Sequence, residues 1–182
     1  MKRRTQDDLR WQKTEESIMH AFVEELQEKP LRKVSVSGLA QRARINKSTF
    51  YLHYEDVFDL GRSYARSLAD NLMEEIDCYD LLADNPLEFA KHFVQAAENP
   101  ARQEHPKLLN ENALVSVFLE QLVKNLYGAI EGLLPQNVTD EELKVRVTFI
   151  ITGIMGVIQF RPEMNAQDIA NVLDSMRISF EG

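Results

Sequence analysis

Apolar residues recur every three to four positions along nearly the whole of this 182-residue chain, and this spacing restricts the fold more than any other feature. A helix presents one apolar face with that period, whereas a half-buried strand needs strict alternation of apolar and polar residues. No segment sustains such alternation. The sequence therefore predicts an all-α protein.

Three helices are expected within the first 55 residues. An apolar stripe around Ile18 and Phe22 marks the first, which should end near Pro30 because proline lacks the N–H that a continuing helix needs. Ser35 is placed as the N-cap of a second, short helix, and Asn46 as the N-cap of a third.

Longer helices are expected in the remainder of the chain. Asp56 is placed as the N-cap of a long helix with an apolar ridge that continues to Ile76, and Asn85-Pro86 opens another helix. Further helices are expected from about residue 112 to 134, from Thr139 to about residue 160, and from about residue 165 to 180.

The formal charge is divided unevenly along the chain. Residues 1–55 carry 11 Lys and Arg against 8 Asp and Glu, a net charge of +3, whereas residues 56–182 carry −11, so that the whole chain has −8. The field of such a molecule would orient its basic N-terminal part toward a polyanion. We therefore expect a domain boundary between residues 55 and 56, with an anion-binding domain before it.

The segment from residue 35 to residue 54 has the pattern of two crossed helices. Its first helix carries small residues where the two helices must approach closely. Lys47, Ser48 and Thr49 lie in the first turn of its second helix, the part of a recognition helix that reaches base edges in a major groove. The residues that form the inner seam of the pair are Leu39, Ala40, Ala43, Ile45 and Phe50.

Polar groups suited to phosphate accompany this helix pair. Tyr51 and His53 can donate hydrogen bonds to phosphate oxygens. The helix starts at Ser35 and Asn46 add backbone N–H groups directed at anions. The segment is therefore predicted to bind DNA, with base contacts from its second helix.

This segment resembles the DNA-binding domain of the TetR family of bacterial transcriptional regulators, whose helix-turn-helix ends in an aromatic-rich signature like that of residues 49–54. The resemblance covers about residues 11–60. It implies that Tyr54 mainly packs, with its hydroxyl at the surface. It implies phosphate contacts from Ser35, Ser37, Tyr51 and His53, and base-facing side chains at Lys47, Ser48, Thr49 and Leu52.

Two positions depart from the family pattern. Arg44 stands where the family usually has a turn glycine, so the turn either carries left-handed strain or is built differently, and a cation is added near the DNA. Val57 stands where the family often has a lysine, so a frequent phosphate anchor is missing. The Lys2-Arg3-Arg4 arm either replaces that anchor by lying along a groove or is a solvated tail.

The resemblance also implies a homodimer formed by the last two helices. The helix after Thr139 is apolar nearly all round, so it must be buried on several sides, either in a dimer or in an ordinary monomer core. A symmetric interface would place two recognition helices about 34 Å apart on the DNA. The expected interface residues are Phe149, Ile150, Gly153, Ile154, Val157, Ile169, Val172, Leu173 and Met176.

Several large side chains of the middle helices are candidates to line an effector cavity, although plain core has the same spacing. Glu88 shares a helix face with His92, but two groups are too few for a metal site. With Cys78 as the single cysteine, neither a metal nor another cofactor is expected. The candidate effector-binding residues are Phe89, His92, Phe93, Phe118, Leu122, Tyr127 and Met155.

Taken with this resemblance, the chain is expected to be a homodimeric DNA-binding transcriptional regulator, with residues 1–55 binding DNA and residues 56–182 binding an effector and a second copy. Our leading hypothesis is a repressor that a small-molecule effector releases from a palindromic operator. The alternative is a helix-turn-helix regulator or DNA-organising protein that acts through protein partners without an effector.

Other classes lack support in the sequence. We find no Gly-rich phosphate loop, nucleophile motif or facing pair of Glu-x-x-His motifs, so an enzyme is not expected. The first ten residues are charged and no long apolar run follows, so we expect neither a signal peptide nor a membrane span, and a cytoplasmic location.

Overall fold

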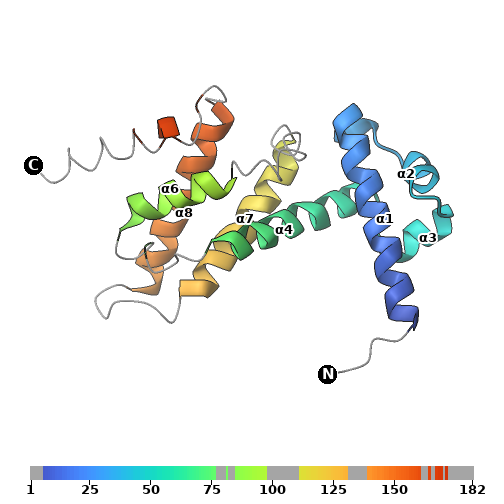
Figure 1. Cartoon of the computed structure of the whole chain (residues 1–182), viewed down its shortest axis with the longest axis horizontal. Coiled ribbons are helices and arrows are strands. Elements are labelled where there is room, and N and C mark those ends of the chain that lie inside the picture. Colours follow the sequence, from blue (N-terminus) through green and yellow to red (C-terminus); the bar gives the residue numbers. More distant parts are fainter. Residues whose placement is uncertain are drawn as a thin grey trace, which may run out of the picture. The chain divides into compact units, whose positions relative to one another are not determined.

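The computed structural model describes residues 6–76, 85–97, 111–130 and 139–160, together with residues 81, 164, 167–169 and 171 (Figure 1). These residues lie in helices and in the segments that join them, and no strand occurs among them. The predicted all-α fold is therefore confirmed. Within these ranges no helix has the length and apolar character needed to cross a membrane.

The chain forms two compact units. The first contains the described residues up to Ala65 and residues 111–115, and the second contains the other described residues from Arg66 onward. The helices α4 (Val57–Glu75) and α7 (Asn112–Ile130) each contribute to both units. The compact unit that holds the predicted DNA-binding segment thus extends beyond residue 55, into α4.

The first unit is built from α1, three short helical segments and the start of α4. Helix α1 packs against α2, and α2 packs against α3. Phe22 of α1 and Phe50 of α3 are fully buried, and the ring of Phe22 meets that of Tyr64 on α4 edge-on, with centroids 5.6 Å apart. The segments before α4 are α1 (Gln6–Glu28), the 3-10 helix η1 (Leu31–Lys33), α2 (Val36–Arg42) and α3 (Lys47–His53).

Side-chain caps fix four of the helix starts that the sequence predicts, at Ser35, Asp56, Asn85 and Thr139. Ser35 Oγ accepts a hydrogen bond from the Gly38 N–H at 3.2 Å and caps α2. Asp56 Oδ1 accepts one from the Asp59 N–H at 2.7 Å, and the Asp59 carboxylate accepts one from the Glu55 N–H at 3.1 Å. The predicted caps at Ser35 and Asp56 are confirmed.

The second unit contains α6 (Pro86–Ala97), α8 (Asp140–Phe160) and the remaining parts of α4 and α7. Helix α6 lies against α8. Residues 167–169 and 171 are helical, as expected for the last helix, and most of the rest of that helix lies outside the described residues. The fully buried side chains of this unit include Phe89, Phe93, Leu122, Leu126, Val147 and Ile151.

Candidate nucleic-acid interface

The turn between α2 and α3 carries left-handed strain. Arg44 has a φ of 56°, a conformation that favours glycine. Its N–H donates to the Gln41 carbonyl at 3.2 Å, and the Ile45 N–H donates to the Ala40 carbonyl at 2.9 Å, which closes the end of α2. The turn therefore places an exposed arginine just before the start of α3, in a strained conformation.

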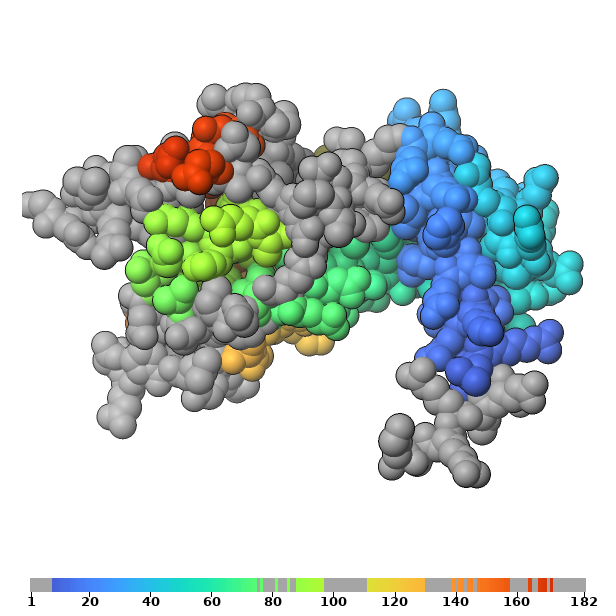
Figure 2. Space-filling view, in the orientation of Figure 1, coloured from blue at the N-terminus to red at the C-terminus, as the bar shows by residue number. Residues whose placement is uncertain are grey.

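Helix α3 is anchored on one side and exposed on the other. Phe50 is fully buried, and its ring lies 5.9 Å from that of Tyr54. The side chains that follow it, Tyr51 and Leu52, are 57% and 70% exposed. The space-filling view shows the segment of α2 and α3 in cyan at the surface of the first unit (Figure 2). The exposed face of α3, here called the outer arc, comprises Lys47, Ser48, Tyr51 and Leu52.

Asn46 precedes α3 in the N-cap position, but its side chain makes no capping hydrogen bond. The Thr49 N–H, which a capping side chain would accept, donates instead to the main-chain oxygen of Asn46 at 3.0 Å. The prediction of a side-chain cap at Asn46 was therefore wrong. Its exposed amide lies next to the outer arc, whereas Thr49 is half-buried.

The two predicted serines lie at the start of α2. Ser35 and Ser37 are both exposed. Because Ser35 Oγ acts as acceptor in the cap of α2, its own hydrogen is left to donate to a group outside the chain. Both hydroxyls are therefore accessible to a phosphate.

His53, at the end of α3, contacts a residue that the sequence did not indicate. Its ring stacks on Trp11 of α1, with centroids 3.7 Å apart and planes 26° apart. Nδ1 of His53 is shielded from solvent and has no hydrogen-bond partner. Burial lowers the pKa of His53 below its ordinary value, although the negative charge of Glu15 acts in the opposite direction. The lone tryptophan in a charged segment, seven residues before Ile18, was the available signal.

Tyr54 connects the same part of α1 to the end of α3. Its side chain is 5% exposed, and its hydroxyl donates to Glu15 Oε1 at 3.2 Å. Burial and the nearby carboxylate raise the pKa of Tyr54 to about 12. The expected packing of Tyr54 is therefore confirmed, and Glu15 provides an acceptor for its hydroxyl within the unit.

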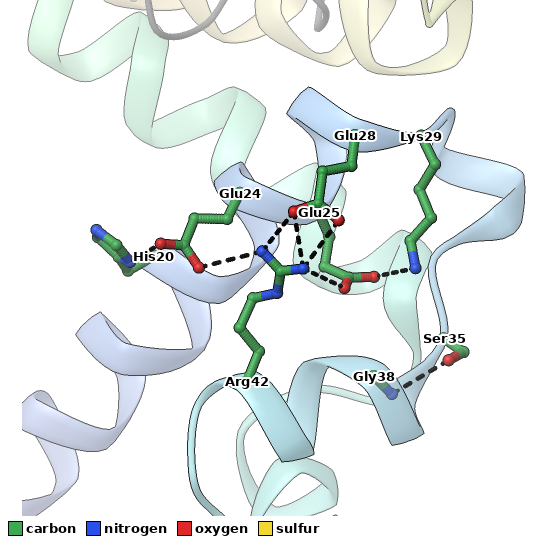
Figure 3. Close-up of polar contacts among 8 residues, drawn as sticks. All are labelled: His20, Glu24, Glu25, Glu28, Lys29, Ser35, Gly38 and Arg42. Carbon is green, nitrogen blue, oxygen red and sulfur yellow. Dashed lines mark hydrogen bonds and ion pairs between the residues drawn. The ribbon is translucent and has the colours of Figure 1, made fainter.

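Arg42 is directed toward the acidic face of α1 (Figure 3). Its guanidinium forms three hydrogen bonds of 2.9 Å to the Glu28 carboxylate and one of 3.4 Å to Glu24 Oε2. Arg42 Nη2 also lies 3.3 Å from Glu25 Oε1. This arginine adds to the formal positive charge of residues 1–55, yet three carboxylates of the same unit neutralise it.

Glu25 is the buried member of this cluster. Its side chain is 5% exposed, and Lys29 Nζ lies 2.5 Å from Oε2. A Cβ at Gly38 would come within 3.3 Å of the same oxygen, so the glycine allows α2 to pack closely over the carboxylate. Arg42, Glu25 and Lys29 therefore fix α2 on α1.

Several cations of the first unit stay on its surface. They come from α1, from η1, from the strained turn and from the start of α3. Exposed cations are the groups that can neutralise DNA phosphates. Among the described residues of this unit, the exposed Lys and Arg are Arg10, Lys13, Arg32, Lys33, Arg44 and Lys47. The Lys2-Arg3-Arg4 arm lies outside the described residues.

No family model and no curated protein matches the chain. Among solved structures, it is similar to the TetR family repressor AlkX from Dietzia sp. strain DQ12-45-1b, which is implicated in biodegradation of n-alkanes. The two superpose with a TM-score of 0.57 at 16% sequence identity, over 91% of this chain and 96% of AlkX. The chain has a TetR-like fold. The fold that the resemblance of residues 11–60 implied is thereby confirmed.

In this TetR-like chain the predicted dimer residues fall into four groups. Phe149 and Gly153 of α8 are exposed, and Ile150 and Val157 are half-buried. Ile154 and Ile169 are only 5% and 4% exposed, so they pack inside the single chain and leave no surface for a partner. The remaining three, Val172, Leu173 and Met176, lie outside the described residues.

The predicted effector residues lie mostly in the core of the second unit. Phe89 and Phe93 are fully buried with ring centroids 6.2 Å apart, while His92 is exposed beside Glu88. His92 therefore lies outside this core and is not placed to meet a buried ligand. The other candidates that are buried are Phe118, Leu122 and Met155, and Tyr127 is half-buried.

Proposed function

We propose that this chain is a DNA-binding transcriptional regulator that reads operator DNA with the outer arc of α3. The supporting observation is that Lys47, Tyr51 and Leu52 are exposed on a helix whose opposite side is anchored by the fully buried Phe50. A rigid helix with polar, aromatic and aliphatic groups on its outer face suits hydrogen bonding to base edges and contact with thymine methyl groups. The similarity to AlkX, a repressor, adds to this argument.

We further propose a homodimer that acts as a repressor on a palindromic operator. Val145 and Phe149 are 62% and 78% exposed and follow each other by four residues on α8. Large exposed apolar side chains on one helix face mark an interaction surface. A second copy with the same face would bury both and present two recognition helices to the DNA.

The last part of this proposal is a small-molecule effector that binds the second unit. A small molecule that binds between its helices would favour a conformation with lower operator affinity, and it would act only through that difference. The regulator without an effector is the alternative, and it is favoured by the contact between the fully buried Phe89 and Phe93, which is the packing of a plain core.

The decisive experiment is selection of bound DNA from a random pool by the full chain. We expect enrichment of a palindrome with half-site centres about one helical turn, or a multiple of it, apart. Recovery of a single half-site would count against the dimer but not against DNA binding. A pool without enrichment, at low salt, would remove the proposed function.

Lys47 and Tyr51 should differ in what their replacement does. Lys47→Ala should change which base is preferred at one operator position, by about 1–3 kcal/mol, because a base contact is lost. Tyr51→Phe should weaken binding to all sequences alike, since it removes a phosphate donor. Anisotropy titrations against a panel of single-base operator variants measure both. Uniform weakening by Lys47→Ala would move Lys47 to the phosphate contacts.

Arg44→Gly should stabilise the fold and weaken DNA binding at the same time. Glycine adopts the φ of 56° without strain, so we expect a net gain of about 0.5–1 kcal/mol in the free energy of unfolding. Loss of the cation should reduce the slope of log affinity against log salt by about one. The control is Arg44→Lys, which keeps both the positive charge and a side chain at the strained position. An unchanged slope in Arg44→Gly would show that this arginine makes no phosphate contact.

A further inference from the structure

We propose that Trp11 is a positioning residue for DNA binding, whose indole holds the His53 imidazole with Nε2 directed outward as donor to a DNA phosphate. The inference rests on the proposed function and adds a residue of α1 to the interface. Its basis is the stack of the two rings, with centroids 3.7 Å apart, together with the shielding of one ring nitrogen.

The exposure of Trp11 shows that the residue is not simply part of the hydrophobic core. The side chain is 47% exposed, although tryptophan offers one of the largest apolar surfaces that a core can use. Its ring contact is with His53, at the C-terminal end of α3. The indole thus covers one face of an imidazole that directly follows the exposed Tyr51 and Leu52.

The shielded nitrogen determines the protonation state and the tautomer of the His53 ring. Nδ1 of His53 has neither solvent nor a hydrogen-bond partner. A hydrogen on Nδ1 would therefore be a buried donor without an acceptor, which is unfavourable, whereas a bare Nδ1 loses less. The stacked ring is thus best described as neutral with its hydrogen on Nε2, the nitrogen that we assign to the phosphate contact.

The charges around His53 are consistent with this form. Glu15 of α1 is the carboxylate that acts on the ring, and it also accepts the hydrogen bond of Tyr54. Trp11 carries no charge. Burial outweighs the effect of Glu15, so the pKa of His53 lies below its ordinary value and the ring stays neutral at neutral pH.

Protonation of His53 should disturb the stack. It puts a hydrogen on Nδ1, where the present position of the ring offers neither solvent nor an acceptor. The neutral stacked form is therefore lost as pH falls from the ordinary histidine pKa of about 6.5 through the lower pKa of the folded protein. Above this range the donor geometry of Nε2 is fixed.

The first test uses the free protein. Trp11 is the only tryptophan of the chain, so tryptophan fluorescence reports on the surroundings of this one indole. We expect a single change in fluorescence between pH 8 and pH 4.5, with a midpoint below about 6.5, that is absent in His53→Gln. A midpoint at or above that value, or the same change in His53→Gln, would overturn the inference.

The second test is a double-mutant cycle on the selected operator at pH 7.5. Trp11→Ala and His53→Ala should each lower affinity about three- to tenfold, and the double variant should be no weaker than His53→Ala. Trp11→Phe, which can still stack, and His53→Gln, which keeps a donor near the place of Nε2, should retain most of the affinity. Losses that add, or an unaffected Trp11→Ala, would show that Trp11 does not act through His53.

Two further measurements distinguish a positioning role of Trp11 from a structural role and from a failure of the proposed function. Trp11→Ala should keep the melting temperature of the wild-type chain within about 2 °C, because the indole is half exposed, and a large drop would assign Trp11 a structural role instead. A wild-type chain that binds no DNA would overturn the proposed function and this inference with it. A wild-type chain that binds DNA while the cycle shows no coupling would overturn the inference alone.

Discussion

Replacing Phe149 by Asp should convert the proposed dimer to a monomer and lower the affinity for a palindromic operator about 10²–10⁴-fold. The side chain is 78% exposed in the single chain, the largest exposure among its described large apolar residues. If the outer face of α8 is the dimer interface, Phe149 lies on it together with Val145 and Gly153. An Asp there would be buried in an apolar contact without a counter-charge, once in each copy, and burying an unpaired carboxylate is strongly unfavourable.

The loss of affinity follows from the loss of the second contact with DNA. In a dimer the second recognition helix binds its half-site at a high effective concentration, set by its physical link to the first. A monomer keeps the contacts of one outer arc and loses this advantage. The affinity for a single half-site should therefore change little in Phe149→Asp, while the affinity for the full palindrome falls.

Gly128→Asp is the matched control for this prediction. Gly128 is an exposed residue of α7, and a Cβ there meets no atom within 4 Å, so the variant adds the same charge without a steric change. Light scattering should give twice 21.0 kDa for the wild type and for Gly128→Asp, and 21.0 kDa for Phe149→Asp. A dimeric Phe149→Asp with wild-type operator affinity would place the interface elsewhere.

Local patterns were sufficient for the helices and for most of their starts. Helical spacing and caps such as Ser35 and Asp56 depend on residues three or four apart, so one sequence contains them. Asn46 shows the limit of that argument, because a main-chain oxygen competes with the side chain for the Thr49 N–H. Ser, Asp and Asn are equally suitable residue types for an N-cap, so only the backbone geometry distinguishes Asn46 from Ser35 and Asp56.

Contacts between distant residues could not be predicted in this way. Trp11 and His53 lie on different helices, and no periodicity tells which faces of α1 and α3 meet. In the same way, α8 is apolar nearly all round, so its pattern could not show that Ile154 faces the core of its own chain while Phe149 faces outward. Counting formal charges had the same limit. The count included Arg42 among the cations available to DNA, although that arginine is held in an ion pair within the protein.

Replacing Arg42 by Met should destabilise the first unit strongly, with a fall of about 5 °C or more in its melting temperature. Methionine keeps the length and the apolar stem of the side chain but removes the charge and its hydrogen bonds to Glu28. Glu25, 5% exposed, would then be a buried carboxylate whose remaining ion pair is with Lys29. The Arg42 side chain is itself 30% exposed, so the destabilisation comes from the buried Glu25, which loses one of its two counter-charges.

Arg62→Met provides the matched control in the same unit. Arg62 pairs with Asp59 at 3.1 Å, and both side chains are more accessible to solvent than the pair of Arg42 and Glu25. Exposed ion pairs contribute little to stability, so the melting temperature should hardly change. Glu25→Gln in the Arg42→Met background should recover part of the loss, because a neutral amide removes the uncompensated charge.

The salt dependence of operator binding separates this structural role of Arg42 from a direct contact with DNA. A cation that neutralises a phosphate adds about one to the slope of log affinity against log salt, and its removal takes that contribution away. Because three carboxylates of α1 surround Arg42, its removal should leave the slope unchanged while the melting temperature falls. Arg44→Gly should behave in the opposite way, with a smaller slope and a higher melting temperature. A reduced slope with unchanged stability in Arg42→Met would show that Arg42 leaves Glu25 to bind phosphate, and that the acidic face of α1 takes part in DNA binding.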